Sequence, residues 1–201
     1  GNFGKSLFGS EVYGSVSSPG NDPSVITVGS ANSKATAVRS DDILNTFSSR
    51  GPTRGKLTLE NGTVRRDNLL KPDLVAPGNM LVGAAATRAD SATPTWNNLG
   101  ALFYPVLVTP TGITQTYRET QMYLSGTSVS APVVSGAAAV LLQVNPGLTP
   151  PMVKAILQYT AQPLAGQNLL QQGAGLVNLP GAVTLAKVLR ATTDELSNCP
   201  G

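Results

Sequence analysis

The stretch that decides the fold is Ser125-Gly126-Thr127-Ser128-Val129-Ser130-Ala131-Pro132, which leads into small and apolar residues as far as Gln143. Because Asn145-Pro146-Gly147 ends that run, the pattern predicts one helix over about 127–143, buried on most of its faces. The residues that we expect in its core are Val133, Val140 and Leu141. Ser128 stands where a loop of small residues becomes this helix, and the free N–H groups of a helix N-terminus stabilise negative charge.

A serine at the start of a helix has two interpretations. Serine and threonine are common N-caps, so Thr127 and Ser128 fit a purely structural role. The hydroxyl also fits a nucleophile, because the helix N-terminus stabilises the alkoxide and the oxyanion that it generates. The α/β-hydrolase class is excluded, because its Gly-x-Ser-x-Gly motif requires glycine where Ser130 stands and a histidine downstream. The 201 residues contain no histidine.

Short strands are predicted before this motif. The β-branched run at 24–30 and the buried segment Leu74-Val75-Ala76 are each bounded by turn-forming residues. Residues 44–53 fit a strand that runs into a turn. The polar stretch 54–70 and the aperiodic stretch at about 86–119 predict two surface insertions.

Helices are predicted after the motif. Thr149 precedes Pro150, and apolar residues then recur at helical spacing, which predicts a helix over about 150–160. Pro180 opens a third amphipathic helix that extends to about Arg190. Early strands and late helices favour an α/β or α+β fold, and 201 residues suit one domain or a part of one.

Composition excludes several classes of function. Only 12% of the residues are charged and the net charge is +3 with scattered basic residues, so we expect no nucleic-acid partner. The longest apolar run is shorter than the roughly 20 residues that span a bilayer, so we expect no membrane partner. Cys199 is the single cysteine, which excludes an internal disulfide framework and a cysteine metal site. An enzyme built on this chain must work without histidine or obtain one from elsewhere.

Four further motifs occur along the chain. They are Ser18-Pro19-Gly20 with Ser24-Val25-Ile26-Thr27-Val28-Gly29, Phe47-Ser48-Ser49-Arg50-Gly51-Pro52, Lys71-Pro72-Asp73-Leu74-Val75-Ala76-Pro77-Gly78 and Gly173-Ala174-Gly175-Leu176-Val177-Asn178. With 125–132 they resemble, in the same order, motifs of the subtilisin-like serine proteases. The resemblance covers nearly the whole chain apart from 54–70 and about 86–119. It implies an α/β, three-layer subtilisin-like fold with a mostly parallel sheet.

The resemblance implies a set of site residues. Ser128 is the nucleophile, and the side chain of Asn2 and the Ser128 backbone N–H are the donors to the oxyanion. The pocket for the residue before the scissile bond is bordered by Gly1, Ser125 and Gly126. The family order Asp, His, Ser places the other triad members upstream, so we expect residues 1–201 to be the C-terminal portion of a single catalytic domain. Without a base for Ser128, we expect this portion to be inactive alone.

The resemblance also implies a weak cation site. Carbonyl ligands there suit Ca²⁺ or Na⁺ and come from Gly20, Asp22 and Val25. We expect no cofactor to be required for the chemistry, with Ca²⁺ at most a structural ion. Ser18–Pro19 is expected to be a cis peptide. Asp73 belongs to the Pro-Asp motif and is expected to be a structural carboxylate, and a base from Lys154 or Lys187 is disfavoured because both lie on polar helix faces.

The function that we expect is a serine endopeptidase that cleaves polypeptides through an acyl-enzyme on Ser128, extracellular by the family resemblance alone. Its partner is the upstream part that carries Asp and His, and an exposed sheet edge favours self-association. The alternative is a non-catalytic module of this fold that binds peptides or a partner subunit, although a binding module does not need the amide of Asn2. A two-chain enzyme, with Asp and His on the other chain, is a third possibility. Asn61-Gly62-Thr63 fits a glycosylation sequon and a hairpin turn, and we favour the turn.

Overall fold

The computed structural model describes residues 1–84 and 121–197, and for residues 191–197 it describes the helical backbone alone. The strands are β1 (Val28–Asn32), β2 (Ile43–Leu44), β3 (Lys56–Thr58), β4 (Val64–Arg66), β5 (Leu74–Pro77), β6 (Leu81–Ala84) and β7 (Gln121–Leu124). The helices are the 3-10 turn η1 (Arg39–Asp41), α3 (Thr127–Val144), α4 (Pro150–Thr160), α5 (Leu169–Gln172) and α6 (Leu179–Ser197). The helix predicted over 150–160 is confirmed, and α6 continues beyond its predicted end at Arg190.

The central sheet has the strand order β2-β1-β5. β1 runs parallel to β5, with Val28 opposite Leu74, and antiparallel to β2, with Ala31 opposite Leu44. The pairs β3–β4 and β6–β7 are antiparallel. The α/β fold is confirmed, with the parallel pair at its centre and the antiparallel pairs around it.

Two predicted strands are shorter than expected. The strand predicted at 24–30 begins only at Val28. The N–H of the preceding residue, Thr27, donates to the side chain of Asp73 (Oδ2, 2.7 Å) and not to a neighbouring strand. The strand at 44–53 ends at Leu44, since the Ser48 N–H closes a turn onto the Asn45 carbonyl. The Ser18–Pro19 peptide is cis, as expected.

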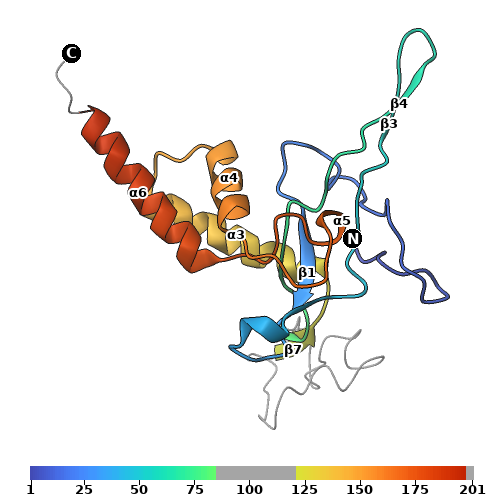
Figure 1. Cartoon of the computed structure of the whole chain (residues 1–201), viewed down its shortest axis with the longest axis horizontal. Coiled ribbons are helices and arrows are strands. Elements are labelled where there is room, and N and C mark those ends of the chain that lie inside the picture. The colour runs from blue at the N-terminus through green and yellow to red at the C-terminus, as the bar shows by residue number, and fades with distance from the viewer. Residues whose placement is uncertain (85–120, 198–201) are drawn as a thin grey trace, which may run out of the picture.

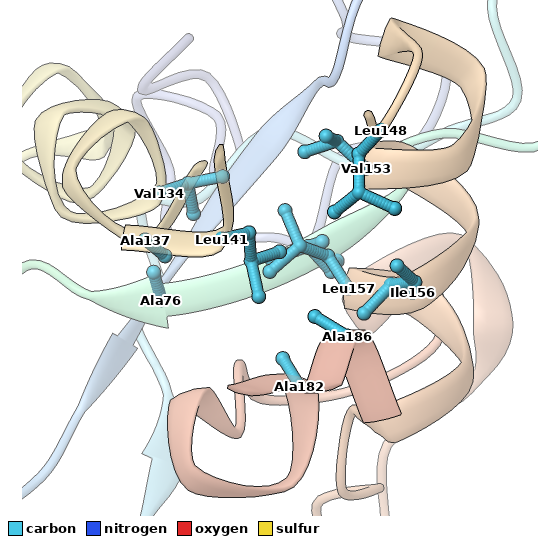
Figure 2. Close-up of a cluster of buried hydrophobic side chains, with 11 residues drawn as sticks. Ala76, Val134, Ala137, Leu141, Leu148, Val153, Ile156, Leu157, Ala182 and Ala186 are labelled. Atoms are coloured by element: carbon cyan, nitrogen blue, oxygen red, sulfur yellow. The ribbon is translucent and has the colours of Figure 1, made fainter. Parts of the chain in front are cut away.

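β5 divides the molecule into two apolar clusters, because successive strand residues point to opposite faces. Leu74 and Ala76 belong on one face to a cluster with residues of α3, α4 and α6, and Figure 2 shows Ala76 beside Ala137 of α3. Val75 packs on the other face with Leu164 and Leu176, from the segment around α5. The helices therefore lie on one face of the sheet, and Leu164 and Leu176 contribute to the cluster on the other (Figure 1). Leu176 also pairs in parallel with Val75, along the edge of β5 that is away from β1.

The helix predicted over about 127–143 is confirmed as α3, which packs on the central sheet and on α6, but it is buried along one stripe and not on most of its faces as expected. Its buried residues follow one another at helical spacings of three and four positions and are Thr127, Ser130, Val134, Ala137 and Leu141. Val133 and Val140, expected in the core, are only half-buried because they flank this stripe. By length and apolarity α3 could cross a membrane, but the packing of its stripe against the sheet and α6 is that of a core helix.

The stretch 54–70, predicted to be a surface insertion, contains the antiparallel hairpin of β3 and β4. β3 and β4 are fully exposed and project from the rest of the described chain (Figure 1). Asn61-Gly62-Thr63 forms the turn, where Gly62 has φ +78° and the Thr63 N–H donates to Asn61 Oδ1. The insertion expected at about 86–119 and Cys199 lie outside the described residues.

Candidate active site

The first residues of the chain lie along the segment 46–49. The Gly1 carbonyl accepts from the Ser49 N–H at 2.9 Å, and the Phe3 N–H donates to Ser49 Oγ at 3.0 Å. The Gly4 N–H donates to the Phe47 carbonyl at 2.8 Å. Bonds on both sides of Asn2 therefore fix its backbone and direct its side chain toward α3.

Asn2 supplies the N-terminal cap of α3. Asn2 Oδ1 accepts from both the backbone N–H and the hydroxyl of Thr127, each at 3.0 Å. The N-cap position itself is Gly126, which has no side chain to offer. Capping by Thr127 or Ser128, the structural interpretation of the motif, is therefore not what the structure shows, because a residue far away in the sequence caps this helix.

The amide nitrogen of Asn2 lies beside the hydroxyl of Ser128. Gly126 has φ +153°, and a Cβ atom built on it would meet Asn2 Nδ2 at 3.2 Å and Ser128 Oγ at 3.3 Å. The two groups thus border the same small space above Gly126. A larger residue at this position would fill that space and strain the backbone.

Ser128 is available for chemistry. It is exposed, and within the described residues neither its hydroxyl nor its backbone N–H makes a hydrogen bond. Its N–H belongs to the first turn of α3, where N–H groups lack partners within the helix. An oxygen that carried negative charge above Gly126 could accept from this N–H and from Asn2 Nδ2, which is the arrangement of an oxyanion hole.

The loop before α3 is fixed to the end of β5. The Gly126 N–H donates to the Gly78 carbonyl at 2.9 Å, and the Met80 N–H donates to Ser125 Oγ at 2.8 Å. Gly78 leaves no room for a side chain, because a Cβ atom there would collide with the hydroxyls of Ser130 and Ser30. The position of Ser128 is therefore set by the sheet as well as by the helix.

The sequence is similar to those of known proteases. Residues 1–176 match the model of the subtilase family of peptidases. The chain belongs to the subtilase family. It is 31% identical over 171 residues to serine protease AprX of Bacillus subtilis and 30% identical over 174 residues to the subtilisin-like protease SBT6.1 of Arabidopsis thaliana, matches that each cover 84% of the chain. The chain spans 31% of AprX and 12% of SBT6.1.

Solved subtilase structures are similar to the chain as well. The CspB protease of Clostridium perfringens superposes with a TM-score of 0.56 at 25% identity over 87% of this chain and 29% of its own. Fervidolysin of Fervidobacterium pennivorans, a keratinolytic enzyme related to subtilisin, gives a TM-score of 0.55 at 25% identity over 83% of this chain and 20% of its own. The similarity covers most of this chain and less than a third of either neighbour.

The structure brings most of the expected subtilase site residues together. Asn2, Gly126 and Ser128 meet at the start of α3. Ser125 lies beside them, and its hydroxyl is engaged by Met80, whereas Gly1 lies against Ser49. Whether Gly1, Ser125 and Gly126 contact a substrate remains a prediction.

Asp73 has the structural role expected for it in this subtilase. It is buried, and its Oδ2 accepts from the Thr27 N–H and from the Lys71 ammonium, each at 2.7 Å. Its Oδ1 lies 3.1 Å from the ammonium of Lys154. The ammonium of Lys154 is therefore paired with Asp73, and that of Lys187 is exposed to solvent on α6. Neither lysine provides a base for Ser128.

Two of the three carbonyls expected to bind a cation, those of Gly20 and Val25, already accept hydrogen bonds from side chains of the protein. The Val25 carbonyl accepts from the ammonium groups of Lys71 at 3.0 Å and Lys154 at 2.9 Å. The Gly20 carbonyl accepts from the Thr27 hydroxyl at 2.6 Å, and the Asp22 carboxylate accepts from Ser24. Positive charge thus already stands where a metal ion would have to bind.

Sequence reasoning missed the buried lysine of this cluster. The side chain of Lys71 is 2% exposed, and burial lowers the pKa of its ammonium while the hydrogen bond to Asp73 raises it. The available signal was the Lys71-Pro72-Asp73 sequence, which places a cation two residues from a carboxylate before a buried strand.

Proposed function

We propose that this subtilase is a serine endopeptidase in which Ser128 attacks the peptide carbonyl. The observation that carries this proposal is that Ser128 Oγ and Asn2 Nδ2 border one space at the N-terminus of α3. The serine oxygen forms a bond to the carbonyl carbon and gives its proton to a base. The negative charge that develops on the carbonyl oxygen is stabilised by Asn2 Nδ2 and the Ser128 N–H.

The intermediate then collapses to an acyl-enzyme. The carbon–nitrogen bond breaks, and the leaving amine takes the proton from the base. A water molecule, activated by the same base, attacks the ester on Ser128 and releases the second product. The role of α3 is the same in both steps, because the charge develops on the same oxygen.

The base must come from outside these 201 residues, which contain no histidine. We propose that an upstream part of the same catalytic domain supplies the histidine and its aspartate. Two features support a docking place for it. The uncovered face of α3 carries the small residues Ala131, Ser135 and Ala139, and on the side of β1 away from β5 no described strand lies beside Val28 and Gly29.

The substrate that we propose is an extended polypeptide, with Gly1, Ser125 and Gly126 beside the residue that precedes the scissile bond. Ser125 and Gly1 are exposed, and they lie close in sequence to Ser128 and Asn2 respectively. Extracellular location is the corresponding proposal for the compartment, and it rests on family membership.

Hydrolysis of casein by the full-length protein tests this function. Ser128→Ala should reduce hydrolysis to the residual level that binding and the oxyanion site leave. Ser135→Ala is the matched control, because Ser135 is an exposed serine on the same helix. Full activity of Ser128→Ala would contradict the proposal, and inactivity of the unmodified full-length protein would favour the non-catalytic binding module.

A further inference from the structure

Lys154 reaches from α4 to three oxygens of two distant segments. Its ammonium donates to the Pro23 carbonyl at 3.0 Å and the Val25 carbonyl at 2.9 Å, and it lies 3.1 Å from Asp73 Oδ1. An ammonium group has three N–H donors, so these contacts use all of them. The three oxygens converge on one point as ligands do around a bound cation.

Lys71 completes the cluster from the other side. Its ammonium donates to the same Val25 carbonyl at 3.0 Å and to Asp73 Oδ2 at 2.7 Å. Both oxygens of the buried carboxylate therefore face positive charge. Buried charges persist in proteins when they are paired and hydrogen-bonded, and this cluster satisfies both conditions.

The buried cluster carries more positive than negative charge. Lys71 and Lys154 contribute two positive charges and Asp73 one negative charge. Asp22 lies close enough for both lysines to help lower the pKa of its carboxyl, although its hydrogen bonds from Ser24 contribute more. A divalent ion added to this site would meet two ammonium groups at the carbonyl that it needs.

We propose that the ammonium of Lys154 is the resident cation of the loop 20–27 and that this loop binds no metal ion. Lys154 then does structurally what a bound cation would do, because it draws two loop carbonyls and the carboxylate before β5 onto one positive charge. It also ties α4 to the entrance of β1. This inference does not depend on the proposed proteolysis.

The chemical reactivity of the lysines in the unmodified full-length protein tests whether the Lys154 ammonium holds this position. Amines are acetylated with an N-hydroxysuccinimide ester, and the rates at Lys71, Lys154 and the exposed Lys187 are compared by mass spectrometry. We expect Lys71 and Lys154 to react about tenfold or more slowly than Lys187, because their donors are held in charge-assisted hydrogen bonds. Millimolar calcium chloride or chelator should leave these rates unchanged. Reaction of Lys154 as fast as Lys187, or faster reaction when calcium is added, would overturn the proposal, since a metal ion would displace the ammonium.

Thermal unfolding of two matched variants provides a second test. Lys154→Met keeps most of the aliphatic chain but removes the cation, whereas Lys187→Met makes the same change at an exposed helix position. In chelator we expect Lys154→Met to melt clearly below the unmodified protein and Lys187→Met to match it. Equal melting temperatures for the two variants would contradict a cation role for Lys154.

Discussion

Asn2 uses the two ends of its amide group differently. Oδ1 caps α3 through Thr127, and Nδ2 lies beside Ser128, where an oxyanion would form. A substitution that changes only one end separates the two roles.

We predict that Asn2→Asp will lose activity and keep stability. Aspartate retains the oxygen that accepts from Thr127, and a carboxylate at a helix N-terminus is favourable. It lacks the N–H donor, so kcat should fall by about 10²–10³-fold, the size of effect known for one oxyanion donor in this family. Enzyme kinetics and the melting temperature of the full-length protein measure the two effects.

Asn2→Ala is the comparison for this prediction. It removes donor and cap together, so activity should fall as far and the unfolding free energy should also fall by about 1 kcal/mol. An Asn2→Asp protein with unchanged kcat would show that Nδ2 does not act on the oxyanion.

Asp42 is a buried carboxylate with incomplete pairing. Arg39 lies 3.7 Å from its Oδ2, too far for a hydrogen bond, and within the described residues that oxygen has no hydrogen-bond partner. Burial raises the pKa of Asp42, and the nearby Arg39 opposes the shift. The folded state therefore binds a proton more readily than the unfolded state, and stability falls as pH rises through the raised pKa.

We predict that Asp42→Asn will stabilise the protein at neutral pH. The variant removes the charge that is costly to bury, and the gain should be on the order of 1 kcal/mol. The gain should shrink as pH falls through the raised pKa of Asp42 and be lost below about 4, where Asp42 is protonated in both states. Urea unfolding at pH 7 and at pH 4 measures this, and a variant less stable than the original at pH 7 would refute it.

Residue roles were predictable from sequence where a local motif carries them. Motifs predicted that Ser128 and Asn2 belong to one site, and both lie beside Gly126, although their catalytic roles stay predictions. The structural role of Asp73 was also predicted from a motif, and its buried contacts agree with it. Lys154 was expected to be solvated, yet it contacts Pro23 and Val25, whose positions in the sequence are 131 and 129 residues away. No local pattern encodes a contact of that kind, because it depends on where packing on α6 and α3 places α4.

At the scale of elements, α3 determines the core and the site together. Its buried stripe, Val134, Ala137 and Leu141, packs on the sheet, and its N-terminus positions Ser128. The bounds of α3 were predictable, since Gly126 and Asn145-Pro146-Gly147 frame an apolar run. The rotation of α3 about its own axis was harder to predict than its bounds. The run is apolar on nearly all sides, so periodicity could not distinguish Val133 and Val140 from the residues that face the sheet.

Two neighbouring leucines test the rotation of α3. Leu141 is 0% exposed and Leu142 is 43% exposed. We predict that Leu141→Ala lowers the unfolding free energy by about 2–5 kcal/mol, because it leaves a cavity in the core. Leu142→Ala should change it by about 0.5 kcal/mol, as for a surface position. Denaturant unfolding of both variants measures the difference, and equal losses would mean that α3 is rotated.

At the scale of the whole molecule, the described residues bring the proposed nucleophile Ser128 and the proposed oxyanion donor Asn2 together at Gly126, and the 201 residues contain no histidine to act as the base. The exposed face of α3 begins next to this site, and among the described strands none pairs with Val28 and Gly29 on the side of β1 away from β5. A partner that covered them could bring a histidine to Ser128. Self-association through the same sheet edge remains a prediction for the chain alone.

The measurement that tests the central claim most directly is the mapping of a fluorophosphonate adduct on the chain. We predict no adduct on the 201 residues alone, because Ser128 has no base to remove its proton. Addition of an upstream segment that carries Asp and His should produce an adduct on Ser128, and Ser128→Ala should remove it. Rapid, stoichiometric labelling of Ser128 in the chain alone, or an adduct on another serine once the upstream segment is docked, would contradict this mechanism.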